Sequence, residues 1–181
     1  MRWRSSSNWK KPNANVTPDF SQLLAKLADS GFEFVIIGGY AAVAHGSAQV
    51  TRDIDVCAVL TSENVETLRR ALAEWKPKHR MTSQRLSFLD VPPPGTPVNS
   101  LYLQTDVGVV DVLSSVLGVG DFERLKSRAE KLEVDGRIHW LIALEDLIAA
   151  KEAVGREKDL LVVKELRAIA AKRRALDGAG G

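Results

Sequence analysis

Two short stretches of the sequence decide how this chain folds: Ile37-Gly38-Gly39-Tyr40-Ala41-Ala42-Val43-Ala44-His45-Gly46 and Thr51-Arg52-Asp53-Ile54-Asp55-Val56. The apolar run 32–37 leads into the first stretch and predicts a strand, and the run 40–45 predicts a short helix that stops at a glycine. The second stretch opens a predicted strand over residues 53–60. The chain therefore makes a tight glycine turn between a strand and a helix, and the free N–H groups of that helix can meet an anion.

Two carboxylates stand two residues apart on the second predicted strand. Asp53 and Asp55 point to the same face of that strand, about 6–7 Å apart along the chain, while Ile54 and Val56 face the covered side of the sheet. Like charges so placed repel each other unless cations lie between them. Carboxylate oxygens together with substrate phosphates are the ligands that Mg²⁺ prefers. The spacing therefore predicts a site for Mg²⁺ or Mn²⁺ at this strand.

The glycine turn and the acidic strand together favour a nucleotide site. Gly38 and Gly39 allow the backbone to approach a ligand closely, and the positive end of the following helix suits phosphate. A triphosphate would then lie between this turn and a metal ion bound by the carboxylates. The alternative interpretation is a tight strand-to-helix turn beside a solvated acidic strand end.

A third carboxylate is expected, either to hold a second metal ion or to accept a proton. Asp111 is the preferred candidate, because it interrupts the apolar run 109–113, where an unpaired charge would cost several kcal/mol. Asp106 is the competitor, but it falls in the turn predicted before Gly108, where Asp is common for local reasons.

The remaining pattern predicts one domain of the α/β (α+β) class, a mixed sheet covered by helices with a helical C-terminal extension from about residue 143. Residues 1–17 are expected to be a flexible arm, residues 18–174 the domain, and residues 175–181 a flexible tail. The other predicted elements are helices over 19–30 and 62–75, strands over 85–91, 99–104 and 109–113, a short helix after residue 120, a hairpin around 135–136 and two C-terminal helices.

Composition excludes several classes of protein. A chain of 181 residues with one cysteine and three histidines has no disulfide framework and too few ligands for a structural zinc site. We expect no membrane span and no signal peptide, and hence a cytoplasmic protein. The first eleven residues and residues 155–174 each carry a net charge of +4, whereas residues 12–154 carry −5. Basic ends are compatible with a polyanionic ligand, and ordinary solvated surfaces explain them equally well.

A basic residue lies on the apolar stripe of the first C-terminal helix. Lys151 follows Leu144, Leu147 and Ile148 at helical spacing, so its side chain is directed inward. Two interpretations remain open. Lys151 forms a buried ion pair with Asp159 that fixes the helix hairpin, or it contacts nucleotide phosphates together with Arg156 and Lys158. The two are compatible.

The motifs carry a resemblance to a known family. The Gly38-Gly39 turn, the Thr51-x-Asp53-Ile54-Asp55 motif and Asp111 resemble the nucleotidyltransferase superfamily that includes DNA polymerase β. Within it, residues 20–170 look most like the AbiEii-type and minimal nucleotidyltransferases, some of which are toxins.

The resemblance implies a metal-dependent enzyme that moves a nucleoside monophosphate from a nucleoside triphosphate to an acceptor hydroxyl, with release of pyrophosphate. It implies Asp53, Asp55 and Asp111 as catalytic and metal-binding residues and adds Thr51 to the nucleotide-binding residues. It also implies an acceptor such as tRNA, a protein or a small molecule, and a cognate antitoxin if the chain is a toxin.

Two positions depart from the family pattern. Gly39 stands where many relatives have Ser, which removes a hydroxyl contact to phosphate. Gln49 stands where close relatives often have Arg, which removes a cationic contact. The alternative function is therefore a catalytically weak nucleotide-binding or partner-binding module of the same fold, which would bind nucleotide without releasing pyrophosphate.

Overall fold

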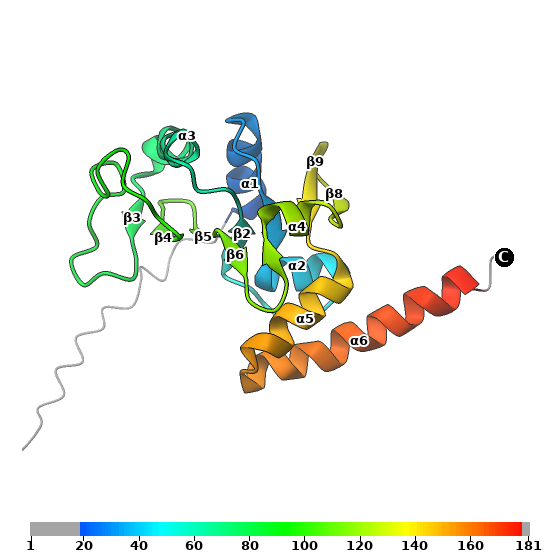
Figure 1. The fold of residues 1–181 in the computed structure, drawn as a ribbon. Coiled ribbons are helices and arrows are strands. Elements are labelled where there is room, and N and C mark those ends of the chain that lie inside the picture. The colour runs from blue at the N-terminus through cyan, green and yellow to red at the C-terminus, as the bar shows by residue number, and fades with distance from the viewer. Residues whose placement is uncertain (1–18, 179–181) are drawn as a thin grey trace, which may run out of the picture.

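The computed structural model describes residues 19–178, which are built around a seven-stranded mixed sheet (Figure 1). The sheet order is β3-β4-β5-β2-β1-β9-β8. Its strands are β1 (Val35–Ile37), β2 (Asp53–Cys57), β3 (Lys78–His79), β4 (Ser100–Gln104), β5 (Val109–Leu113), β8 (Glu130–Val134) and β9 (Arg137–Leu141). A separate two-stranded ribbon consists of β6 (Ser115–Val116) and β7 (Gly120–Asp121). The mixed sheet confirms the predicted fold class.

Six α-helices accompany the sheet in the described part of the chain. They are α1 (Phe20–Asp29), α2 (Gly38–His45), α3 (Ser62–Leu72, continued by a 3-10 turn over Ala73–Trp75), α4 (Phe122–Lys126), α5 (Leu144–Val154) and α6 (Glu157–Gly178). Helix α2 packs on β1 and β2, and α5 and α6 pack on α2. Helix α1 begins where the sequence predicts, because the Asp19 side chain accepts a hydrogen bond of 2.9 Å from the Gln22 N–H.

The strand directions bring distant parts of the chain into register. Strand β2 runs antiparallel to β1 and parallel to β5. Asp55 consequently lies opposite Ile37 on one side and opposite Asp111 on the other. Ile54 and Val56, which alternate with the two aspartates of this strand, are fully buried in the core, where burial of each side chain contributes about 1.5–3 kcal/mol. The alternation of buried and pocket-facing side chains predicted for this strand is confirmed.

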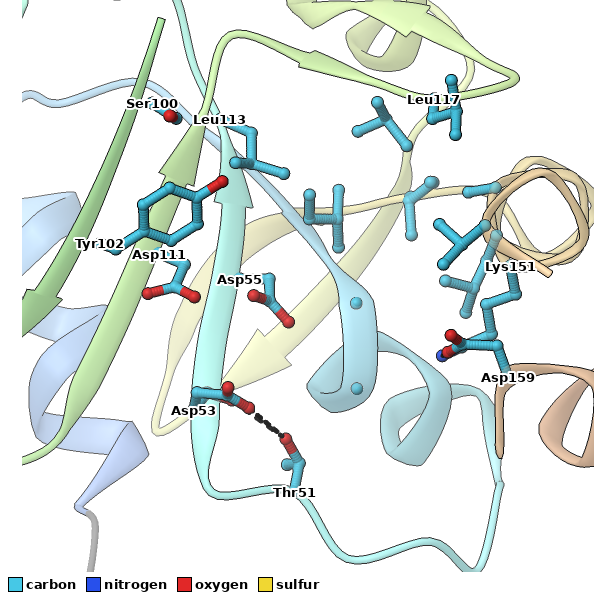
Figure 2. Close-up of a pocket in the computed structure, with 18 of the residues that line it drawn as sticks. Thr51, Asp53, Asp55, Ser100, Tyr102, Asp111, Leu113, Leu117, Lys151 and Asp159 are labelled. Atoms are coloured by element: carbon cyan, nitrogen blue, oxygen red, sulfur yellow. Dashed lines mark hydrogen bonds and ion pairs between the residues drawn. The ribbon is translucent and has the colours of Figure 1, made fainter. Parts of the chain in front are cut away.

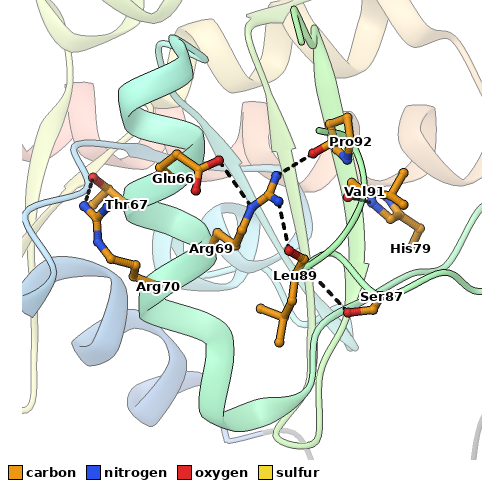
Figure 3. Close-up of polar contacts among 9 residues, drawn as sticks. All are labelled: Glu66, Thr67, Arg69, Arg70, His79, Ser87, Leu89, Val91 and Pro92. Atoms are coloured by element: carbon orange, nitrogen blue, oxygen red, sulfur yellow. Dashed lines mark hydrogen bonds and ion pairs between the residues drawn. The ribbon is translucent and has the colours of Figure 1, made fainter. Parts of the chain in front are cut away.

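The strand predicted over residues 85–91 is wrong. The strand at this edge is β3, which pairs with β4, and residues 85–91 form no ladder with it beyond an isolated bridge between Lys78 and Ser87. Side chains bond the carbonyl groups of Leu89, Val91 and Pro92 (Figure 3), and the backbone N–H of His79 bonds the carbonyl group of Leu86.

Two side chains of the domain bind main-chain carbonyl groups of residues 80–99, called the 80–99 segment below. Arg69 of α3 donates to the carbonyl oxygens of Leu89 (3.0 Å) and Pro92 (2.8 Å), and its guanidinium lies 5.0 Å from the ring of Phe88. The Nε2 atom of His79 lies 2.7 Å from the carbonyl oxygen of Val91. A carbonyl group removed from water needs a hydrogen-bond donor. Here the Arg69 and His79 side chains supply the donors that a neighbouring strand would otherwise supply.

The C-terminal helices form the predicted hairpin. Gly155 ends α5 in a left-handed conformation with φ of 68°, and α6 then runs to Gly178, so the expected boundary at residue 174 falls inside this helix. Glu165 of α6 accepts hydrogen bonds from the Ser47 hydroxyl (2.6 Å) and the Ala48 N–H (2.7 Å). Within residues 19–178, no helix is long and apolar enough to cross a bilayer. The expected N-terminal arm, residues 1–17, lies outside the described residues.

Candidate functional site

Three aspartates meet on one face of the central strands. The parallel pairing of β2 and β5 sets Asp55 beside Asp111, and Asp53 lies two residues before Asp55 on the same face (Figure 2). One carboxylate oxygen from each of the three residues lies within 4.8 Å of the other two. The structure therefore brings together the three carboxylates that the sequence singled out.

The rival carboxylate lies elsewhere. Asp106 sits in the turn between β4 and β5, its side chain is 59% exposed, and it lies 3.7 Å from the Lys76 ammonium group. Its backbone N–H donates to the carbonyl oxygen of Trp75. Of the two candidates for the third carboxylate, only Asp111 joins the cluster.

Burial disfavours the ionised form of two of the carboxylates. Burial, together with the neighbouring charges of Asp53 and Asp111, raises the pKa of Asp55 to about 7. Burial also raises the pKa of Asp111, although a hydrogen bond from Arg80 opposes that rise. Close oxygen donors with unbalanced negative charge fit a hard divalent cation. The cluster is thus consistent with a divalent metal site.

Gly38 closes the turn against the acidic strand. Its φ is +66°, and a Cβ atom at this position would lie 2.1 Å from the Asp55 Oδ2 atom. No other residue fits there without moving the carboxylate, because both the backbone conformation and the space exclude a side chain. The start of α2 is therefore in direct contact with the carboxylate cluster.

The two departures from the family pattern have a local explanation. A Cβ atom on Gly39 would lie 2.8 Å from the Thr51 Oγ1 atom, so the Thr51 hydroxyl fills the space that a serine would need. Thr51 in turn donates to the Asp53 carboxylate at 3.1 Å. The Gln49 amide donates to the Gly39 carbonyl oxygen at 2.9 Å. Gln49 and Thr51 thus hold the glycine turn and the first aspartate in place.

Arg80 is the site residue that sequence reasoning missed. It follows β3, and its Nε atom donates to the Asp111 Oδ1 atom at 3.0 Å while its Nη2 atom donates to Oδ2. Its backbone N–H bonds to the Tyr102 carbonyl oxygen at 2.9 Å. Arg80 lies 31 residues before Asp111 in the chain. Nothing in the local pattern pairs the two residues, because their contact depends on the sheet order.

The C-terminal helices supply the opposite wall of the same pocket. Lys151 pairs with Asp159 at 3.2 Å, and the two side chains are only 11% and 14% exposed. The predicted ion pair is therefore present. Both residues line the pocket together with Arg156 and Lys158, across from the aspartates (Figure 2).

The pocket between these walls has a volume of about 960 Å³. This is near the upper end for small-molecule sites. Apolar side chains separate its two charged ends, and they include Leu113, Leu117, Leu147, Ala150 and Val154. The space can hold a flexible polyanion at the charged ends and an apolar or aromatic group between them.

Known proteins share this architecture. The chain overlays on the lincosamide antibiotic adenylyltransferase LnuA, in its lincomycin-bound crystal structure, with a TM-score of 0.56 and 16% identity, covering 86% of this chain and 99% of that one. It also matches the antibiotic-resistance factor ANT(2'')-Ia (TM-score 0.46, 14% identity, 88% and 92% covered) and a nucleotidyltransferase of Thermotoga maritima described as putative (0.46, 15%, 92% and 99%). A search of curated proteins found no match.

The overlay with LnuA, at this low identity, shows that the sheet and helices have the nucleotidyltransferase fold. The sequence itself is matched by a family model over residues 17–177, nearly the whole chain, and that model is described as "Nucleotidyl transferase of unknown function (DUF2204)". The match includes the glycine turn, the three aspartates and both C-terminal helices. This chain therefore belongs to the DUF2204 family of nucleotidyl transferases.

Proposed function

We propose that this chain is a metal-dependent enzyme that transfers a nucleoside monophosphate from a nucleoside triphosphate to an acceptor hydroxyl. One observation supports it above all. Three carboxylates within 4.8 Å of one another face a glycine turn and a basic helix hairpin across one pocket. Negative groups that hold a cation, and positive groups that hold phosphates, are the two halves of a phosphoryl-transfer site.

Asp53 and Asp55 are the residues that would hold Mg²⁺ or Mn²⁺, and Thr51 orients Asp53 through its hydroxyl. The bound ion would supply positive charge to the phosphate oxygens of the nucleotide. Asp111 has two roles open to it. It completes a second metal site, or it accepts the proton of the acceptor hydroxyl.

The phosphates have donors on both sides of the pocket. Gly38 and Gly39 open α2, where the helix dipole favours negative charge, and the Gly39 N–H also donates to the Asp55 carboxylate. Lys151, Arg156 and Lys158 bring positive charge from the facing hairpin. Lys151 can contact a phosphate and keep its ion pair with Asp159, because an ammonium group has three donors.

The reaction follows from these positions. The acceptor oxygen attacks the α-phosphorus, a new P–O bond forms, and the bond between the α-phosphorus and the bridging oxygen breaks. Pyrophosphate leaves with that bonding pair of electrons, and the hydroxyl proton passes to Asp111 or to water. Positioning and charge stabilisation carry most of the rate in such transfers.

A small-molecule acceptor is supported by the fold match to LnuA, whose printed description names it a lincosamide antibiotic adenylyltransferase. The pocket agrees with a small acceptor, since apolar side chains line the space beside the charged ends. A tRNA or protein acceptor, a cognate antitoxin and the AbiEii-type toxin role stay predictions.

A pyrophosphate-release assay tests the proposal. The protein is incubated with each labelled triphosphate, with Mg²⁺ or Mn²⁺, and with either a cell extract or a panel of hydroxylated antibiotics. We expect one fraction or compound to become labelled, and Asp53→Ala or Asp55→Ala to abolish both labelling and pyrophosphate release. Binding of nucleotide without any release would instead support the alternative, a nucleotide-binding module. Full activity in either variant would refute the proposal.

A further inference from the structure

Arg80 occupies the third carboxylate of the cluster. Its guanidinium donates one hydrogen bond to each oxygen of Asp111, so neither carboxylate oxygen is free of a cationic donor. The Asp111 side chain is only 7% exposed and that of Arg80 is 28% exposed. Two-point pairs of this kind between arginine and a carboxylate are among the strongest and best-oriented hydrogen bonds in proteins.

The position of Arg80 is supported from three directions. Its backbone N–H is bonded to the Tyr102 carbonyl oxygen at 2.9 Å, and its guanidinium lies 5.7 Å from the Tyr102 ring centre. It begins the 80–99 segment, whose far part Arg69 ties to α3 (Figure 3). These contacts fix the Arg80 backbone at the sheet edge and hold its guanidinium beside Asp111.

We propose that the Arg80 guanidinium takes the place of a second metal ion at Asp111, so that the site loads a single divalent ion, on Asp53 and Asp55, together with the nucleotide. This inference rests on the proposed function and deepens it. In a two-metal site the ions lie about 3.5–4 Å apart, so a second ion would need an Asp111 oxygen. To bind there, that ion would either displace the guanidinium, at the cost of two charge-assisted hydrogen bonds, or take a remaining oxygen position directly beside this like charge.

The charges of the cluster itself, counted without the nucleotide, are balanced by one ion. When a single divalent ion is bound and all three carboxylates are ionised, the carboxylates, the guanidinium and the ion have no net charge. A second ion would leave these groups with two excess positive charges, which only the phosphates of the nucleotide could offset. Arg80 already supplies at Asp111 the fixed positive charge that a second ion would supply.

The assignment also separates the two roles open to Asp111. With Arg80 bound along one edge of the carboxylate, each oxygen keeps a further acceptor position. That position can take the proton of an acceptor hydroxyl, and it needs no second metal ion. Asp111 then acts on the acceptor, while Asp53 and Asp55 act on the nucleotide.

Counting bound ions tests the assignment. The full chain is saturated with the α,β-methylene analogue of each ribonucleoside triphosphate, which cannot release pyrophosphate, and Mn²⁺ is titrated by electron paramagnetic resonance, with the analogue alone as background. We expect one Mn²⁺ per wild-type chain and two per Arg80→Gln chain. Arg70→Gln is the matched control, because Arg70 contacts Thr67 on the outer side of α3 and does not line the pocket; it should bind one.

Each other outcome has a definite meaning. Two ions bound to the wild-type chain would overturn the assignment of Arg80 and leave the proposed function standing. One ion bound to a folded Arg80→Gln chain would have the same meaning. If Arg80→Gln does not fold, Arg80→Lys replaces it. A lysine keeps the charge but lacks the planar fork that binds the two oxygens in parallel, and the second Mn²⁺ should bind at least tenfold more tightly than to wild type. An unchanged second binding constant there would also overturn the assignment. Failure to bind any analogue with Mn²⁺ overturns the proposed function, and the role of Arg80 with it.

Discussion

Replacing Asp55 by asparagine should stabilise the metal-free protein while it destroys activity. Asparagine has the same shape as aspartate. In the native protein the Gly39 N–H donates to the Asp55 carboxylate and favours its charged form, and the side-chain oxygen of asparagine can still accept that hydrogen bond. The substitution removes only the charge. In the native protein that charge is buried and lies beside Asp53 and Asp111, and its pKa is about 7 against an ordinary value of 3.8. This difference corresponds to roughly 4 kcal/mol of unfavourable free energy once Asp55 is ionised.

The direction of the pH dependence follows from proton linkage. Below about pH 4, Asp55 is protonated in both the folded and the unfolded chain, and its charge costs nothing. Between pH 4 and pH 7 the unfolded chain releases this proton while the folded chain keeps it, so the wild-type free energy of unfolding falls as pH rises. Above about pH 7 the penalty is complete. The advantage of Asp55→Asn over wild type should therefore be near zero at pH 4 and largest at pH 8.

Thermal melts in EDTA from pH 4 to pH 8.5 measure this difference. For a domain of this size, roughly 4 kcal/mol corresponds to a gain of about 10 °C in melting temperature at pH 8. Asp106→Asn removes a carboxylate from the exposed turn and should differ little from wild type at every pH. An Asp55→Asn chain that is less stable than wild type at pH 8, or whose advantage does not change with pH, would refute the electrostatic account of the cluster.

Three further predictions address the rest of the site. Asp111→Asn should lower the rate of pyrophosphate release by a factor on the order of 10² or more, whereas Asp106→Asn should stay close to wild type; the reverse order would show that the third carboxylate is misassigned. Lys151→Met should leave Asp159 unpaired and cost on the order of 3 kcal/mol in denaturant unfolding, and adding Asp159→Leu should recover most of it; a stable, fully active double variant would exclude a phosphate role for Lys151. Gly38→Ala should displace Asp55, lower the melting temperature and weaken triphosphate binding at least about tenfold in titrations, and unchanged binding would mean that the turn does not contact the nucleotide.

The central part of the site was readable from the sequence because it depends on local periodicity. Asp53 and Asp55 share a face on any extended strand, and Asp111 stands out as a charge in an apolar run, so their meeting required only that the two strands be neighbours. Gly38 was predicted for its backbone freedom, and the structure adds that the Asp55 carboxylate excludes any side chain there. The Lys151–Asp159 pair was predicted from helical spacing across a short turn.

What the sequence did not reveal depends on contacts between distant segments. Arg80 reaches Asp111 because β3 lies two strands from β5 at one edge of the sheet, and no local pattern carries that order. Residues 85–91 have the composition of a strand, but beyond one bridge to β3 the carbonyl groups of Leu89 and Val91 are bonded by the side chains of Arg69 and His79. Local propensity carries no information about these side-chain hydrogen bonds, which are present where the predicted strand is absent.

The attachment of the 80–99 segment has a consequence for how such a pocket can change over evolutionary time. Arg69 and His79 form hydrogen bonds with carbonyl oxygens of the main chain, which every amino acid possesses. Exposed side chains of the segment, such as that of the pocket-lining Met81, can therefore change without loosening these main-chain contacts, whereas the buried Phe88 and the Asp111-bound Arg80 cannot. If the chain is the transferase proposed above, this part of the pocket rim can vary to suit a different acceptor while the three aspartates stay in place.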